Sequence, residues 1–187
     1  MFAVAITLLA LNLAVAGPGH GPLLRQLTDH WPSFVAYLIS FFIVGIIWVN
    51  HHALMNNIAI VDRKLLFLNL LLLLWVVAIP FATGTMADYV TANDQDARIA
   101  MALYALVLIG MSLSFAAIFG WSLADGRTHH PVSPEARPAA WLRFTGGVLA
   151  YVAAFAVAFI NPLAALAIIG LVALYYVFER TPSGRRQ

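Results

Sequence analysis

Runs of apolar residues as long as a bilayer-spanning helix constrain this chain more than any other feature. A helix that crosses the hydrocarbon core of a bilayer needs roughly 20 apolar residues. Six segments approach or reach that length, at about residues 1–16, 31–53, 64–84, 97–121, 140–160 and 162–179. Turn-forming residues separate them, such as Gly17-Pro18-Gly19 and Asn161-Pro162. We therefore expect an all-α, polytopic membrane protein with six transmembrane helices, in which residues 1–187 form a single transmembrane domain.

The composition indicates that most of the protein surface contacts lipid. Of the 187 residues, 63% are hydrophobic and only 10% are charged, whereas soluble domains carry about 25% charged residues. The formal net charge of +2 is too small to indicate a nucleic-acid partner. The absence of cysteine excludes disulfides, thiolate metal sites and a cysteine nucleophile.

The first segment is shorter than the others. Sixteen helical residues reach about 24 Å, less than the roughly 30 Å of hydrocarbon. One interpretation is a signal peptide, since Ala14-Val15-Ala16 resembles a small-residue cleavage site. No Lys or Arg precedes the apolar run, however, so the charged start of a signal peptide is missing. The other interpretation, which we prefer, is a helix that begins upstream of Met1.

Basic residues predict the orientation, because cytoplasmic loops are enriched in Lys and Arg. One set of alternating loops and the C-terminus holds eight of them, and the other set holds only Arg25 and Arg98. The eight are Arg63, Lys64, Arg127, Arg137, Arg143, Arg180, Arg185 and Arg186. With six spans, this predicts that both termini are cytoplasmic and that Asp29, Asp88, Asp94 and Asp96 lie outside.

Polar residues inside apolar segments need an explanation, because they are costly in lipid unless paired. The most concentrated group is Trp48, Asn50, His51 and His52, at the cytoplasmic end of the second segment. Adjacent helical residues point about 100° apart, so the two histidines are poorly placed to bind one metal ion. We expect a structural polar cluster, with no metal and no cofactor.

A stripe on the first segment is the candidate for a pore-lining face. Val4, Leu8 and Leu11 follow one another at i, i+4 and i+7, and Thr7 borders them. Such a stripe occurs in almost any apolar helix, so the pattern alone is more typical of a helix that faces lipid or a protein core than of one that lines a pore.

Several stretches together carry a resemblance to a known family. The first is Phe2-Ala3-Val4-Ala5-Ile6-Thr7-Leu8-Leu9, and the second runs from Trp31 to Phe41 and on through Trp48-Val49-Asn50-His51-His52. The third is Val61-Asp62-Arg63-Lys64-Leu65, continuing to Leu70, with Ile79-Pro80-Phe81 beyond it. These stretches resemble bacterial members of the transmembrane protein 175 family, the endolysosomal-type potassium channels, over about the first half of the chain.

The resemblance implies a potassium-permeable cation channel in a cell membrane, most simply a bacterial inner membrane. It implies a homotetramer in which the first helices surround one pore. Apolar rings would form a hydrophobic gate, which places Val4, Leu8 and Leu11 at the constriction with Thr7 beside them. Potassium ions, the lipid bilayer and further copies of the chain would be the partners. The family also carries an Arg, three residues and Phe-Ser-Asp just before this helix. In this sequence Met1 stands directly after the place of that motif.

Other functions fit the sequence less well. The main alternative is a membrane redox protein with haem or quinone between its helices, but such bundles usually supply axial histidines from facing helices. Here the only histidines within the segments are His51 and His52, at one end of one helix. A proton-coupled transporter would want acidic residues mid-membrane, and all eight lie in loops or at segment ends. No paired carboxylates, nucleophile motif or glycine-rich phosphate loop indicates an enzyme.

Overall fold

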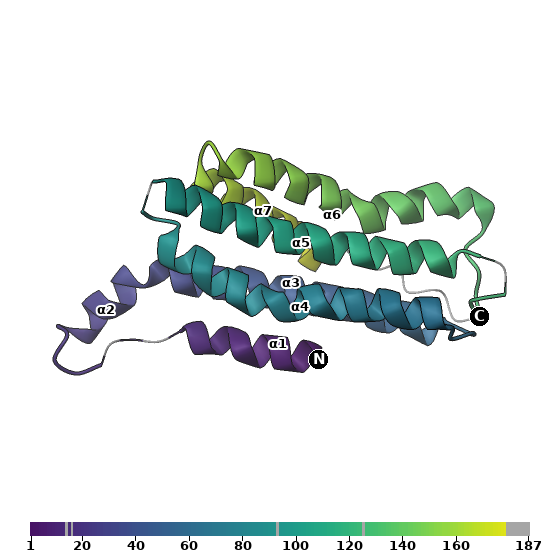
Figure 1. Ribbon diagram of the computed structural model, residues 1–187, viewed down its shortest axis with the longest axis horizontal. Helices are drawn as coiled ribbons and strands as arrows, with labels where there is room; N and C mark the ends of the chain where they lie inside the picture. Colours follow the sequence, from purple (N-terminus) through teal and green to yellow (C-terminus); the bar gives the residue numbers. More distant parts are fainter. Residues whose placement is uncertain (14, 16, 93, 125, 179–187) are drawn as a thin grey trace.

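The computed structural model is a bundle of long, roughly antiparallel helices (Figure 1). It describes residues 1–178 except 14, 16, 93 and 125, and only the backbone of 143–145 and 178. Its elements are α1 (Phe2–Leu9), η1 (Ala10–Asn12), α2 (Leu23–Asp29), α3 (Trp31–Asn56), α4 (Arg63–Tyr89), α5 (Gln95–Ser122), η2 (Pro134–Ala136), α6 (Arg137–Ala158) and α7 (Pro162–Phe178). The all-α architecture expected from the sequence is confirmed. Three basic residues of the orientation argument, Arg180, Arg185 and Arg186, lie outside the described residues, as do Ala14 and Ala16.

Four helices are long and apolar enough to cross a membrane, by length and composition. They span Trp31–Asn56, Arg63–Tyr89, Gln95–Ser122 and Pro134–Ala158, whereas Phe2–Asn12 and Pro162–Val177 are apolar but shorter. Side-chain caps start several of them: the carboxylate of Asp62 accepts a hydrogen bond from the Leu65 amide at 2.7 Å, and that of Asp94 accepts from the Ala97 amide at 3.1 Å. Pro162, which cannot continue a preceding helix, begins α7.

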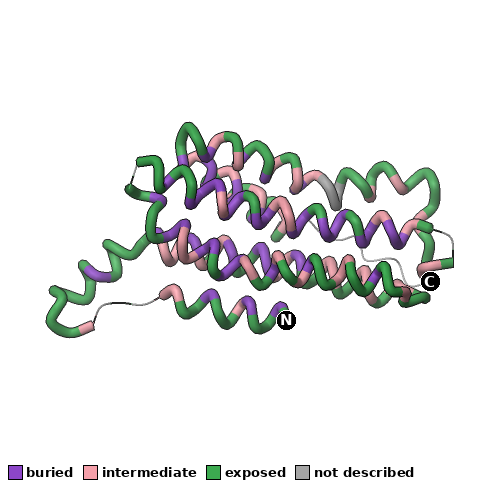
Figure 2. The backbone as a smooth tube through the Cα atoms, in the orientation of Figure 1, coloured by how far each residue is buried: buried purple, intermediate pink, exposed green. Residues whose placement is uncertain are grey.

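Helix α5 forms the centre of the bundle. It packs against α4 on one side and α6 on the other, and it is the most thoroughly buried helix (Figure 2). Its contact with α4 is close at Gly110, where a Cβ would lie only 2.3 Å from the Trp75 ring. The small-residue spacing of Gly110 and Ser114 thus lies at a helix–helix contact, as such spacings do in membrane proteins.

Three buried hydroxyl groups join α3, α4 and α5 inside this core. The Ser40 hydroxyl lies 2.8 Å from that of Thr83 and 2.7 Å from that of Tyr104, and the Thr83 hydroxyl also donates to the Ile79 carbonyl. All three hydroxyl groups are therefore satisfied by one another or by the backbone, which is what burial in an apolar core requires.

Two departures from the expected helices occur near the N-terminus. The first helical segment ends at Asn12 instead of residue 16, because Leu13 leaves the helical conformation at φ −93° and ψ 52°. The loop that follows contains an additional short helix, α2, which projects beyond the end of the bundle (Figure 1). The Gln26 side chain holds this loop through hydrogen bonds with the Gly17 amide and the carbonyls of Gly17 and Gly21.

Candidate pore-lining face of the first helix

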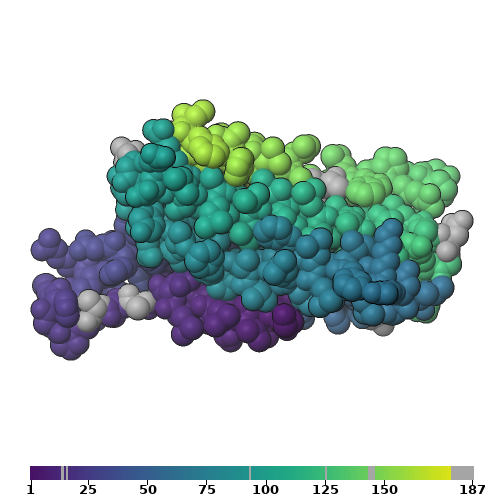
Figure 3. All heavy atoms as spheres, viewed as in Figure 1, coloured from purple at the N-terminus to yellow at the C-terminus, as the bar shows by residue number. Residues whose placement is uncertain are grey.

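Helix α1 lies along the outside of the bundle, against α3 and α4 and away from α6 and α7 (Figures 1 and 3). One of its faces is buried in the subunit: Phe2, Ala5 and Leu9 are 9%, 0% and 0% exposed. Because these three residues pack against the long helices, the rotation of α1 about its own axis is determined by the core.

The four residues predicted to line a pore all lie on the opposite, exposed face. Val4, Leu8 and Leu11 are 51%, 38% and 74% exposed, and Thr7 is also exposed. The structure thus brings the four together on one face of α1 and η1, pointing away from their own subunit. Three leucine or valine side chains on such a face need either lipid or a neighbouring subunit to cover them.

The Thr7 hydroxyl has a defined orientation on this face. It donates to the Val4 carbonyl at 2.9 Å, one turn earlier in the helix. A hydroxyl carries one proton and two acceptor lone pairs, so this bond leaves the oxygen free to accept from water or to coordinate a cation.

Both ends of the first helical segment are attached to the long helices. At one end the Phe2 ring lies 5.3 Å from the His51 ring of α3, centroid to centroid. At the other end the Asn12 amide nitrogen donates to the Pro80 carbonyl of α4 at 3.1 Å. A Cβ on Gly84 would come within 2.9 Å of the Asn12 side-chain oxygen, so α4 offers the Asn12 amide a close-fitting site.

The structure distributes the predicted polar cluster of α3 over three directions. His51 faces α4 and α1, where its Nε2 lies 2.8 Å from the Asn69 side-chain oxygen. Trp48 and His52 are exposed and stack on each other, with ring centroids 5.9 Å apart. Asn50 lines a cavity shared with α5, α6 and α7. Trp48 and His52 are therefore brought together, whereas Asn50 and His51 are not.

The loops at the end of the bundle where α4 starts and α5 ends form a connected structure. Asp62 caps α4 and its second oxygen accepts from the Trp121 indole at 3.2 Å. The Arg127 guanidinium lies 4.6 Å from the Trp121 ring and donates to the Trp121 carbonyl. The hydrogen bond from the Leu65 amide is the main reason that the pKa of Asp62 lies below its usual value. These contacts join the start of α4 to the end of α5.

Long apolar helices that also expose large apolar side chains on their outer faces define a membrane protein, in which these faces contact lipid or other subunits. Comparison with known proteins identifies which kind. The family model described as "Endosomal/lysosomal potassium channel TMEM175" matches residues 1–80.

Two relatives and one solved structure extend the similarity over the whole chain. A protein named as a potassium channel of Streptomyces collinus is 42% identical over 192 residues, covering 100% of this chain and 91% of the relative. One so named from Chamaesiphon minutus is 32% identical over 190 residues, covering 96% and 89%. The crystal structure of a lysosomal potassium-selective channel TMEM175 homolog from Chamaesiphon minutus superposes with a TM-score of 0.81 at 30% identity, covering 94% of this chain and 90% of that one.

The chain therefore belongs to the TMEM175 family and is a multi-pass membrane protein. The resemblance expected from the first half of the sequence is confirmed. Because this is a family of ion channels, the expectation that the chain is not an enzyme is also confirmed.

The sequence analysis missed the buried hydroxyl cluster of Ser40, Thr83 and Tyr104. The available signal was a lone serine or threonine inside an otherwise apolar segment, since such a residue requires a partner in lipid. The sequence does not indicate which residues pair, because the three lie 43 and 64 positions apart along the chain.

Proposed function

We propose that this chain is one subunit of a potassium-permeable channel whose pore is lined by α1. The observation that carries the proposal is the orientation of α1: its exposed face holds Val4, Thr7, Leu8 and Leu11, while its other face is buried in the subunit. Similarity to proteins named as potassium channels supports the choice of ion.

The proposed assembly is a homotetramer in a cell membrane, most simply a bacterial inner membrane. Four copies of α1 would meet around one axis, and rings of Val4, Leu8 and Leu11 would form the constriction. Each subunit would contribute six spans, the two short apolar helices α1 and α7 included. The arrangement of α1 on the outside of its own subunit supports this assembly, because its exposed face is available to the other three copies.

The mechanism follows from the chemistry of these side chains. Potassium in water is strongly hydrated, and a ring of valine or leucine offers it no replacement ligands. A narrow apolar ring therefore stops ions by losing its water, and it passes hydrated ions when it widens. Thr7, whose hydroxyl proton is used by the Val4 carbonyl, would present its oxygen to the ion next to this barrier.

We also propose that both termini are cytoplasmic. The described basic residues Arg63, Lys64, Arg127 and Arg137 lie at or near the starts of α4 and α6, at the end of the bundle toward which the start of α1 points (Figure 1), and cytoplasmic ends are rich in such residues. A reporter fused after Gln187 is expected to be active only in the cytosol. Activity of that fusion in the periplasm would contradict the orientation.

Potassium flux from liposomes that contain the purified protein tests the pore. Leu8→Asn and Val4→Asn are expected to wet the constriction and increase the leak, and Leu8→Trp is expected to reduce it. Leu149→Asn is the matched control. Leu149 is an exposed leucine of α6, which lies on the side of the bundle away from α1 (Figure 1). If the α1 variants leave flux unchanged while the α6 variant alters it, the pore is elsewhere.

The redox alternative receives no support from the relatives reported above, which are named as channels. The described histidines of the spans also face different helices: His51 contacts α1 and α4, and His52 stacks on Trp48 of its own helix. A Soret band in the absorption spectrum of the purified protein would argue for haem and against the channel.

A further inference from the structure

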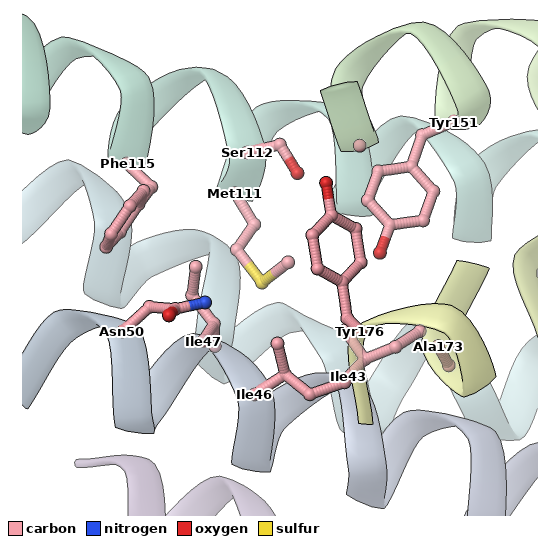
Figure 4. A pocket seen from close by; sticks show the side chains of 11 residues that line it. Ile43, Ile46, Ile47, Asn50, Met111, Ser112, Phe115, Tyr151, Ala173 and Tyr176 are labelled. Carbon is pink, nitrogen blue, oxygen red and sulfur yellow. The ribbon is translucent and has the colours of Figure 1, made fainter. Parts of the chain in front are cut away.

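A partly open cavity between the helices of the subunit, separate from the exposed face of α1, is the feature that the proposed function does not use. Its volume is about 50 Å³, and it lies where α3, α5, α6 and α7 meet (Figure 4). Most of its lining is apolar, but Asn50, Ser112 and Tyr151 bring an amide and two hydroxyl groups to it, together with Tyr176.

Three of these groups, the Asn50 amide and the Ser112 and Tyr151 hydroxyl groups, have no hydrogen-bond partner among the described residues. Ser112 and Tyr151 are 8% and 5% exposed, so both are more than nine-tenths buried. Within the part of the chain that the structure describes, neither hydroxyl nor the Asn50 amide makes a hydrogen bond. Buried polar groups are almost always paired with protein or with ordered water, and the Ser40–Thr83–Tyr104 cluster shows how this core pairs such groups when it can.

The cavity has the size and the chemistry that water requires. A water molecule needs a cavity of roughly 10–15 Å³ and two to four polar partners. A volume of about 50 Å³ therefore holds a few molecules. In Figure 4 the Ser112 and Tyr151 side chains come from α5 and α6, and the Asn50 side chain comes from α3. Three helices thus each supply one hydrogen-bonding group.

A second cavity lies beside this region, toward the end of the bundle that carries Thr128 and Pro131. It has a volume of about 200 Å³ and is lined by residues of α3, α5 and the loop near Thr128, with Asn57 and Ser122 among them. Asn50 lines both cavities. Its amide therefore stands between the interior of the subunit and the loops, which lie at the proposed cytoplasmic face.

We propose that the inner cavity is a hydration site, held by Asn50, Ser112 and Tyr151, that exchanges water with the loop end of the bundle past the Asn50 side chain. Each subunit then contains water at membrane depth that is separate from the shared pore. Asn50 has a distinct role from His51 and His52 in this arrangement: it binds water and separates two cavities, whereas the histidines pack against neighbouring side chains.

The natural absence of cysteine makes this proposal directly testable, because one introduced thiol is the only one in the protein. Ser112→Cys places a thiol in the inner cavity. Ser114→Cys is the matched control: Ser114 is 3% exposed on the same helix, but its hydroxyl donates to the Gly110 carbonyl and it does not line the cavity. Ala59→Cys, in an exposed loop, serves as the accessible reference.

The protein is placed in lipid nanodiscs, which leave both faces accessible, and treated with silver ions. It is then unfolded, and the remaining thiols are labelled with a fluorescent maleimide. Thiols react in ionised form and therefore in contact with water, so Ser112→Cys is expected to react at least about tenfold faster than Ser114→Cys. Equal rates for the two variants would overturn the hydration site. Met111→Cys, at another residue that lines the cavity, provides a second reporter if Ser112→Cys does not fold.

The route past Asn50 has its own test. Asn50→Leu, combined with Ser112→Cys, replaces the amide by an apolar group of similar size, and the reaction with silver is expected to slow by about tenfold or more. If the rate does not change, the Asn50 side chain does not separate the two cavities and this part of the proposal is wrong. Neither result depends on potassium flux, so failure here leaves the α1 pore to be judged separately.

Discussion

Replacement of Gly110 by alanine tests the close packing of α4 against α5. The added Cβ would lie 2.3 Å from the nearest Trp75 ring atom, whereas carbon atoms in contact prefer about 3.5–4.0 Å. The indole must therefore move by more than about 1 Å, and it is a rigid ring packed inside the bundle. Overpacking of this kind costs about 1–3 kcal/mol.

Glycine-to-alanine substitution also has a favourable effect on helix formation, which must be separated from the clash. Gly45→Ala is the control, because a Cβ at Gly45, in the middle of α3, has no atom within 4 Å. Its change in unfolding free energy is expected to reflect only helix propensity, which favours alanine over glycine by about 1 kcal/mol. The difference in unfolding free energy between Gly110→Ala and Gly45→Ala is therefore the cost of the clash with Trp75.

Thermal unfolding of the purified protein in detergent, followed by the loss of the folded peak in size-exclusion chromatography, provides the measurement. At about 2–4 °C per kcal/mol for a chain of this size, Gly110→Ala should unfold about 2–12 °C below Gly45→Ala. Adding Trp75→Phe should recover part of the loss, because the smaller ring leaves room for the methyl group. A Gly110→Ala protein as stable as Gly45→Ala would refute this account of the α4–α5 contact.

Two further substitutions test the polar contacts of the fold. Ser40→Ala removes the hydrogen-bond partner of the buried Tyr104 hydroxyl. We expect the free energy of unfolding, measured in denaturant, to fall by about 1–3 kcal/mol. An unchanged free energy would contradict the stabilising role of the buried hydroxyl cluster. The pKa of Asp62 in the folded protein lies below its usual value of 3.8, chiefly because the carboxylate accepts a hydrogen bond from the Leu65 amide. The ionised carboxylate therefore stabilises the fold above pH 3.8, and this stabilisation is lost as the pH falls through the lower pKa of the folded state. The wild-type protein should therefore lose more stability than Asp62→Asn over that acid range, and equal losses would show that Asp62 does not contribute.

The segments near 20 apolar residues could be located from the sequence because length and hydropathy are local properties. The expected segment 31–53 corresponds to α3 (Trp31–Asn56), and the expected segment 97–121 corresponds to α5 (Gln95–Ser122). Helix α2 could not be found in this way, since seven residues give too little periodicity to recognise. Its loop is held by Gln26 bonding to the backbone of Gly17 and Gly21, a pairing that only the folded loop defines.

For the candidate site too, some features could be predicted from the sequence and others depend on tertiary packing. Spacing placed Val4, Leu8 and Leu11 on one stripe, because helical geometry alone determines which residues share a face. Whether that face points inward or outward depends on the packing of Phe2, Ala5 and Leu9 against other helices. The polar residues near His51 were grouped by proximity in sequence, but a helix separates neighbours by about 100°. Which helices they face follows from tertiary packing: His51 contacts α1 and α4, and Asn50 lines a cavity beside α5 and α7.

The way α1 is held limits how the proposed gate can open. Its buried face fits the core at Ala5 and Leu9, its start packs on His51, and its end is bonded through Asn12 to the Pro80 carbonyl. A rotation of α1 that removed Leu8 from a constriction would break these contacts and turn apolar core residues toward water. Movements that keep the contacts cost less: whole subunits can shift relative to one another, or the Val4 and Leu8 side chains can change rotamer. Because α1 is attached to α3 and α4 at both ends, a displacement of those long helices would carry the pore face with them, and so provides the simplest mechanical link between the body of the subunit and the conduction path.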